Sequence, residues 1–260
     1  MDRTVALGDG AETRLESWGS AGPIVLCVHG ITSSRRSWTR LGETLAPDYR
    51  VFAYDQRGHG DSAEVEGPMT LQRSVADLAA VALALPGSAD LLIGHSWGGA
   101  VAILGGRKTG AHKVLAIDPM IRVAAGTFES EYVDDLRPLY ATHGDEREQG
   151  IRAMYEGAHS ADIEGKVHSM LPMSIESLER LGRENNVDAG AWDIRKDVAT
   201  YPVPLLILAA GVDSVMSPDD VAFIRREGGP NVSLRIVEGQ GHNLHRDAFE
   251  NFVEAVRAFV

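Results

Sequence analysis

A serine flanked by glycines is the sequence feature that most constrains the fold. A G-x-S-x-G pattern spans residues 94–98, with Ser96 at its centre, between an apolar run at 91–93 and a helix-forming run at 100–104. A sharp turn from a strand into a helix brings backbone segments close together, and glycine admits that approach because it has no Cβ. The pattern therefore predicts Ser96 in a strained turn above a sheet, near the positive end of the following helix.

The rest of the chain alternates between expected strands and helices. Residues 3–7 and 13–18 alternate apolar and polar side chains, which predicts an opening hairpin. Apolar runs that predict buried strands lie at residues 24–28, 50–54, 91–93, 114–117, 204–209 and 233–237. Helical spacing follows at 37–45, from Thr70 onward and at the C-terminus. This order favours an α/β fold with a mainly parallel sheet that is covered on both faces.

The segment 119–200 has a different character, because strand-like runs disappear from it. Its helical stretches at 128–140, 148–158 and 174–183 carry charged outer faces. We expect a helical cap over 119–200, inserted into a core domain made of residues 1–118 and 201–260. Apolar and aromatic cap residues are candidates for a substrate pocket, although for any single one of them a place in the cap core is the commoner role. The pocket candidates are Met120, Tyr132, Met154 and Trp192 from the cap, with His29 from the core domain.

Composition limits the expected partners and location. The net charge is −12 without a Lys/Arg run, which argues against nucleic acids and anionic membranes and leaves a small-molecule substrate. The single cysteine, Cys27, lies in an apolar run and cannot form an intrachain disulfide. Neither a signal peptide nor a membrane-spanning run is apparent, so a cytoplasmic protein is the default expectation. Composition leaves the oligomeric state open.

Several polar residues follow the predicted strands, where ligand sites of open α/β sheets lie. A serine nucleophile needs a base within hydrogen-bond reach, and the base needs an orienting acid. Ser96, Asp213 and His242 supply these groups in the order serine, acid, histidine. His245 is the alternative base, in a position where a surface histidine is the common case. Asp118, at the end of an earlier strand, is the alternative acid.

An oxyanion would need two preorganised N–H donors. We expect them from the backbone of Trp97, directly after Ser96, and of Ile31, in the loop after the strand at 24–28. Glycine at position 30 would let that loop turn an N–H inward, with His29 bonding within the loop. The polar loop at 56–62 lacks further ligands at metal spacing, so we expect a tight turn braced by Asp55 and Arg57, and no metal site.

Taken together, these motifs resemble the α/β-hydrolase superfamily, and more narrowly its esterase, lactonase and cofactor-free haloperoxidase-type branch. The resemblance covers nearly the whole chain apart from the cap. It implies a mostly parallel eight-stranded sheet flanked by helices, with an inserted helical cap. The matching segments are His-Gly at 29–30, Asp-Gln-Arg-Gly-His-Gly-Asp-Ser at 55–62, Gly-His-Ser-Trp-Gly-Gly at 94–99, Gly-Val-Asp at 211–213 and Gly-His at 241–242.

The resemblance implies a serine hydrolase that cleaves a carboxylic ester or lactone of a mainly apolar small molecule, without a cofactor. Dehalogenases and many epoxide hydrolases of this fold carry Asp where Ser96 stands, which disfavours their activities. Hydrolases of C–C bonds usually carry Asn where His95 stands, so that alternative is weaker. Proline iminopeptidases share the Ser-Trp-Gly-Gly segment but typically have a larger cap. A receptor-like protein that binds a small molecule is the alternative from another functional class.

Overall fold

The core of the protein is an eight-stranded sheet. The computed structural model describes residues 2–123, 131–185 and 192–260, and for residues 131 and 132 it describes the backbone only. The strand order is β1-β2-β4-β3-β5-β6-β9-β10. β1 and β2 form the predicted hairpin, β2 pairs antiparallel with β4, and all other neighbours pair in parallel. The strands are β1 (Asp2–Ala6), β2 (Glu12–Trp18), β3 (Ile24–Val28), β4 (Arg50–Tyr54), β5 (Leu91–His95), β6 (Val114–Ile117), β9 (Leu205–Ala210) and β10 (Val232–Val237).

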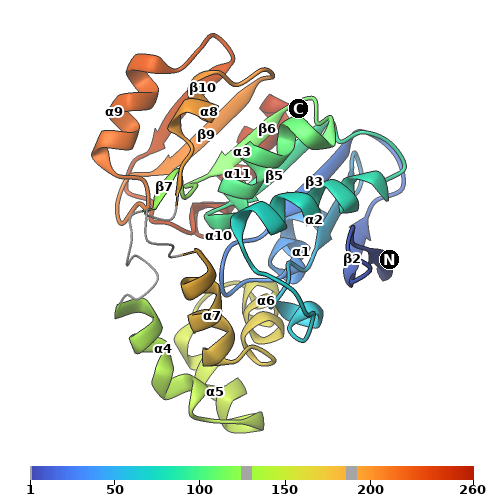
Figure 1. The fold of residues 1–260 in the computed structure, drawn as a ribbon, viewed down its shortest axis with the longest axis vertical. Coiled ribbons are helices and arrows are strands. Elements are labelled where there is room, and N and C mark those ends of the chain that lie inside the picture. Colours follow the sequence, from blue (N-terminus) through green and yellow to red (C-terminus); the bar gives the residue numbers. More distant parts are fainter. Residues whose placement is uncertain (1, 124–130, 186–191) are drawn as a thin grey trace.

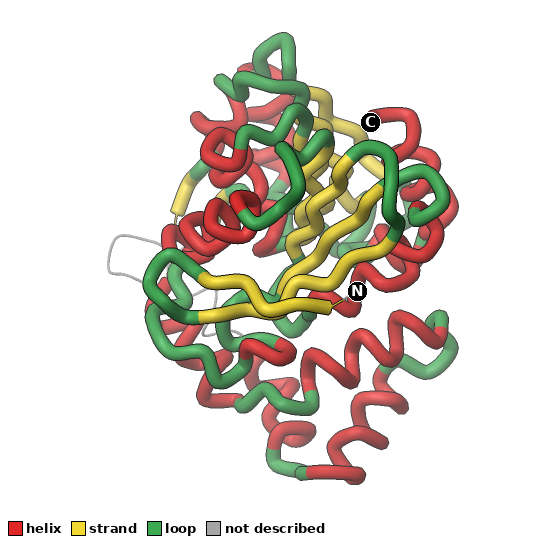
Figure 2. The backbone as a smooth tube through the Cα atoms, turned by 90° about the vertical axis from the view of Figure 1, so that its right-hand side faces the viewer, coloured by secondary structure: helices red, strands yellow, loops and turns green. Residues whose placement is uncertain are grey.

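Helices cover both faces of this sheet, as its apolar strands require (Figures 1 and 2). One face packs against α2 (Leu71–Leu83), α3 (Trp97–Thr109), α8 (Arg195–Ala199) and α9 (Pro218–Glu227). The other packs against α1 (Thr39–Leu45), α10 (Leu244–Asp247) and α11 (Phe249–Phe259). Two short 3₁₀ turns, η1 (Arg35–Trp38) and η2 (Gly60–Ser62), lie in the loops after β3 and β4.

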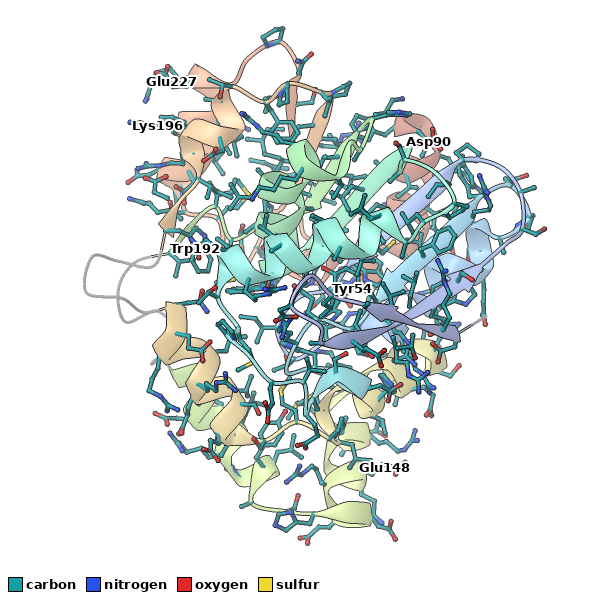
Figure 3. All side chains as sticks on the ribbon, turned by 45° about the vertical axis from the view of Figure 1, so that its right-hand side comes forward. Tyr54, Asp90, Glu148, Trp192, Lys196 and Glu227 are labelled. Atoms are coloured by element: carbon teal, nitrogen blue, oxygen red, sulfur yellow. The ribbon has the colours of Figure 1, made fainter. Side chains whose placement is uncertain are left out.

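The strand β3 shows why both faces must be covered. Val25 and Cys27 point into the core on the α1 and α11 side, whereas Leu26 and Val28 point into the core on the α2 and α3 side. All four are fully buried. Figure 3 shows side chains filling these layers, with Tyr54 inside and Lys196 at the outer surface. The predicted mostly parallel, eight-stranded sheet is therefore confirmed.

Four helices form a separate layer at one end of the sheet (Figure 1). They are α4 (Glu131–Tyr140), α5 (Gly144–Met154), α6 (Ser160–Met170) and α7 (Ile175–Asn185). Their own apolar core includes Ile151, Met170 and Leu178. The short ribbon of β7 (Arg122–Val123) and β8 (Trp192–Asp193) pairs the two chain segments that lead to and from this layer.

The cap sits against the core chiefly through α6, which contacts η1 and α1. The sequence pattern at 160–170 did not predict α6. The helix α8 lies within the predicted cap range, yet it packs against α3 and α9 of the core. The boundaries at 119 and 200 stay a prediction. No helix in the described ranges is long and apolar enough to cross a membrane.

Candidate active site

Ser96 occupies the strained turn between β5 and α3 that its flanking glycines predict. Its backbone has φ 57° and ψ −119°, a conformation that a residue with a side chain rarely adopts. A Cβ on Gly94 would lie 2.1 Å from the carbonyl oxygen of Gly98, and one on Gly98 would lie 2.3 Å from that of Val28. Both glycines are thus required by the close approach of neighbouring backbone.

His242 is paired with a buried acid. Its Nδ1 lies 2.6 Å from Oδ2 of Asp118, which follows β6 directly and is fully buried. The other donors to this carboxylate are the Ser214 hydroxyl at 2.5 Å and the backbone N–H groups of Ala210 and Val215, each at 3.0 Å. Burial alone would raise the pKa of Asp118, but these hydrogen bonds outweigh it and lower the pKa below the usual value. Asp118 is therefore held as a carboxylate that can orient His242.

The expectation that Asp213 supplies the acid is wrong in this structure. Asp213 is exposed in the turn after β9, in the left-handed conformation with φ 49°. Its loop instead holds Asp118 through Ser214 and Val215. Asp118 ends β6, directly beside the strand β5 that leads to Ser96, whereas Asp213 follows β9, one strand further away. The alternative acid is the one that meets the histidine.

A cluster of histidine rings supports the loop that carries His242. The Nε2–H of His95 donates to the carbonyl oxygen of His242 at 2.9 Å, and the two rings lie 4.6 Å apart. The His95 ring also lies 4.2 Å from that of His245, which in turn contacts Trp38. Burial and neighbouring cations hold the pKa of His95 and of His245 well below the ordinary value. His245 is thus a buried neutral side chain, contrary to the surface position expected for it.

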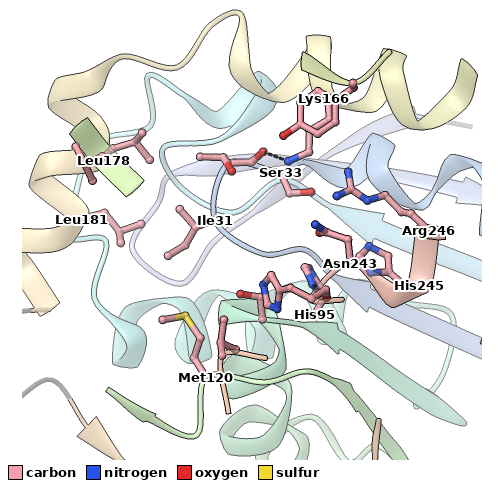
Figure 4. A pocket seen from close by; sticks show the side chains of 16 residues that line it. Ile31, Ser33, His95, Met120, Lys166, Leu178, Leu181, Asn243, His245 and Arg246 are labelled. Carbon is pink, nitrogen blue, oxygen red and sulfur yellow. Dashed lines mark hydrogen bonds between the residues drawn. The ribbon is translucent and has the colours of Figure 1, made fainter. Parts of the chain in front are cut away.

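Ser96 and His242 line the same cavity, of about 400 Å³, between the sheet and the cap (Figure 4). One side of it is apolar and the other polar, and Figure 4 shows Leu178 and Leu181 across the cavity from Arg246. The lining residues are Ile31, Thr32, Ser33, His95, Ser96, Met120, Val133, Tyr155, Lys166, Leu178, Leu181, Val215, His242, Asn243, His245 and Arg246.

The expected oxyanion donors belong to the turn after Ser96 and to the loop after β3. Trp97 is the first residue of α3, so its N–H stands at the positive end of that helix. Ile31 lines the cavity from the loop after β3. The role of these two N–H groups stays a prediction.

The structure places the cap residues that were candidates for the pocket at different positions relative to the cavity. Met120 lines the cavity, whereas Trp192 is not among the lining residues and donates from Nε1 to the Met120 carbonyl at 2.8 Å. Met154 is 49% exposed and does not line the cavity. The side chain of Tyr132 lies outside the described residues. Met120 alone among these four is placed by the structure at the cavity wall.

The prediction that His29 lines the pocket is wrong, because its ring is buried between two loops and does not line the cavity. His29 is 1% exposed, its Nε2 accepts from the N–H of Gln56 at 2.9 Å, and its Nδ1–H donates to Gly30 at 2.8 Å. Burial lowers the pKa of His29 to about 3, so the ring is neutral. Gln56 in turn accepts from the indole N–H of Trp97 at 3.2 Å. The ring thereby ties two loops together beneath the elbow.

The loop at 55–62 is a network of ion pairs. Ligand atoms of Asp55, Asp61 and His168 lie within 4.8 Å of one another, but the guanidinium of Arg35 pairs with both carboxylates. Arg57 forms separate ion pairs within the described chain, as the predicted braced turn requires. The cluster therefore already contains a cation that neutralises its acids.

Sequence reasoning missed the polar side of the cavity. Lys166 and Tyr155 belong to cap segments whose helices were misplaced or not predicted. Arg246 stands only four residues after the predicted base His242, and this closeness in sequence could have indicated it. No comparable signal in the sequence marks Lys166 as facing the same cavity.

The comparisons agree with this fold. A family model described as "Alpha/beta hydrolase family" matches residues 25–255. The chain belongs to this family. Among relatives of this alpha/beta hydrolase, N-formylmaleamate deformylase of Pseudomonas putida is 25% identical over 94% of this chain and 90% of its own. A non-heme haloperoxidase of Rhodococcus erythropolis is 28% identical over 92% of both chains. A crystal structure of the deformylase of Pseudomonas putida S16 superposes with a TM-score of 0.78, at 24% identity, over 98% of this chain and 100% of that chain.

Proposed function

We propose that this alpha/beta hydrolase is a serine hydrolase that cleaves an acyl bond through an acyl-enzyme on Ser96. One observation carries the proposal: the strained Ser96 and the Asp118-bound His242 line one cavity. With Nδ1 of His242 engaged by Asp118, Nε2 is the nitrogen left to act as a base. A base oriented in this way is what a serine hydroxyl needs to become a nucleophile.

The reaction follows from these positions. Nε2 of His242 takes the Ser96 proton while Oγ attacks the substrate carbonyl carbon, and Asp118 stabilises the resulting imidazolium. The N–H groups of Ile31 and Trp97 receive the oxyanion. The leaving group departs with the proton from His242. Water, deprotonated by His242, then attacks the acyl-enzyme and releases the acid.

The acyl bond is that of a carboxylic ester or a lactone, with an amide as the second candidate. The amide is favoured by the relative named N-formylmaleamate deformylase, which aligns over nearly the whole chain. Neither candidate requires a cofactor, because the nucleophile, base and acid are all side chains of this chain. The apolar wall of the cavity, with Met120 and Leu181, suits a substrate with a hydrophobic part.

The test is hydrolysis of a chain-length series of p-nitrophenyl esters, of lactones and of N-formyl amides. The proposal expects turnover that Ser96→Ala abolishes, while Ser88→Ala, which alters an exposed serine, retains it. Ester turnover that Ser96→Ala leaves intact would contradict the proposal. So would a folded protein without activity on any acyl substrate, which would turn attention to C–C bond cleavage or to ligand reception.

A further inference from the structure

Two cations line the cavity beside Ser96. Lys166 reaches it from α6 in the cap, and Arg246 reaches it from α10 in the core (Figure 4). The lining residues include no aspartate or glutamate, and within the described ranges no carboxylate forms an ion pair with either cation. The basic side of the cavity is thus without a matching acid from the part of the chain that the structure describes.

Lys166 is held in place without a carboxylate partner in the described ranges. Its side chain is almost fully buried, Nζ donates to the carbonyl oxygen of Thr32 at 2.9 Å, and the ammonium lies 5.1 Å from the Tyr155 ring centre. An ammonium has three donors, and a buried charge without a counter-ion is costly. Burial and the nearby Arg246 hold the pKa of Lys166 well below its ordinary value. A bound anion would oppose both effects.

Arg246 lies on the other side of the same tyrosine. Its guanidinium carbon is 5.8 Å from the Tyr155 ring centre, and its buried Nε has no hydrogen-bond partner among the described residues. Asp162 is the buried acid in its neighbourhood, and the charge of Arg246 opposes the rise that burial causes in the pKa of that carboxyl. The ion pair that this carboxylate forms within 4 Å is with Arg40, at 3.8 Å. Asp247 beside it is exposed. The fork of Arg246 is therefore available to a planar anion in the cavity.

The overall charge of the chain makes this arrangement unusual. The protein has 37 acidic and 25 basic residues, and many of its arginines outside the cavity pair with acids. Two basic residues on one cavity wall make the local charge there positive, although the net charge of the protein is −12. Such a local positive charge attracts an anionic ligand and suppresses binding of cationic ones.

We propose that Lys166 and Arg246 bind a carboxylate of the substrate while the Ile31 and Leu181 side of the cavity holds its apolar part. The inference rests on the proposed function and names its substrate class: an ester, lactone or amide that also carries a free carboxylate. A carboxylate has a single charge and a planar shape that a guanidinium matches with two parallel hydrogen bonds. This replaces the expected mainly apolar substrate with an amphiphilic acid.

The experiment compares two substrates of equal length. One is the p-nitrophenyl monoester of a C6–C8 dicarboxylic acid, and the other is the p-nitrophenyl ester of the monocarboxylic acid with the same chain. The wild type should show a larger kcat/KM for the anionic ester. Lys166→Met and Arg246→Gln should each lower the ratio of anionic to neutral kcat/KM by about 10-fold or more, mainly through KM. The matched control, Lys108→Met, removes an exposed lysine and should leave the ratio unchanged.

A binding measurement separates this inference from the proposed function. Calorimetry of the C6–C8 dicarboxylates with the Ser96→Ala protein reports the anion site without any turnover. Dicarboxylate binding that Lys166→Met and Arg246→Gln weaken supports the site even if no ester is hydrolysed. Hydrolysis with an unchanged ratio, and no dicarboxylate binding, would overturn the anion site and leave the hydrolase intact. Because the two variants lie in different helices, a folding failure of one leaves the other to decide.

Discussion

Nδ1 of His242 lies 2.6 Å from Oδ2 of Asp118, although 124 residues separate them in the chain. Asp118 stands at the end of β6 and His242 in the loop after β10, so the contact exists only once the parallel sheet has formed. The carboxylate accepts from four donors and is fully buried. This pair occupies Nδ1 of His242 and leaves Nε2 as the ring nitrogen that can act as a base.

Asp118→Asn should lower kcat on the order of 10³- to 10⁴-fold, because an amide at this position would leave His242 in the wrong tautomer. Asp213→Asn is the matched control, since both aspartates adopt a positive φ that asparagine tolerates. It should change kcat by less than about threefold. Steady-state kinetics of the two variants on one ester show which aspartate orients His242. A larger loss of kcat in Asp213→Asn than in Asp118→Asn would reverse the assignment of the acid.

Ser96→Gly should abolish turnover and yet give a more stable protein than Ser96→Ala. The φ of 57° at this position strains any residue with a Cβ, at a cost of about 1–3 kcal/mol that glycine avoids. The greater chain entropy of glycine in the unfolded state offsets part of the gain, so we expect a difference of about 1 kcal/mol. Urea denaturation of both variants measures it. Equal or lower stability of Ser96→Gly would argue against a strained elbow.

Gly98→Ala should destabilise the fold by at least about 2 kcal/mol, because its new methyl group would lie 2.3 Å from the Val28 carbonyl oxygen. Gly241→Ala is the matched control, since nothing lies within 4 Å of a Cβ there. Thermal denaturation should show a clear drop for the first variant and little change for the second. Similar melting temperatures for both would mean that the elbow accommodates a side chain.

Stability should fall as the pH drops from 7 towards 5. Burial lowers the pKa of His29 and of His59 to about 3, against an ordinary value of 6.5. Below pH 6.5 these histidines therefore bind protons in the unfolded chain but not in the folded protein. The free energy of unfolding decreases until the pH reaches the pKa values of the folded protein. Each such histidine contributes a slope of up to about 1.4 kcal/mol per pH unit.

Urea titrations at several pH values test this linkage. His59→Gln should remove one histidine's share of the slope, whereas His112→Gln, which alters an exposed ring, should retain the full slope. A wild-type free energy of unfolding that is flat between pH 7 and 5 would contradict the neutral burial of these rings.

Local patterns predicted much of the fold because they act over few residues. The apolar runs gave β3, β4 and β6 with their observed bounds, and the flanking glycines indicated the turn at Ser96. The choice between Asp118 and Asp213 could not be made in this way, since it depends on the order of strands across the sheet. The same holds for Lys166, which reaches the cavity through the packing of α6 on η1.

We propose that Ser96, His242 and Asp118 act together on an acyl group. The most direct measurement is labelling with a fluorophosphonate, followed by intact-mass and peptide mass spectrometry. We expect one adduct, on Ser96, that forms in the wild type and in Asp213→Asn, forms far more slowly in Asp118→Asn, and is absent from Ser96→Ala. An adduct on another residue, or no adduct on a folded wild-type protein, would contradict the account.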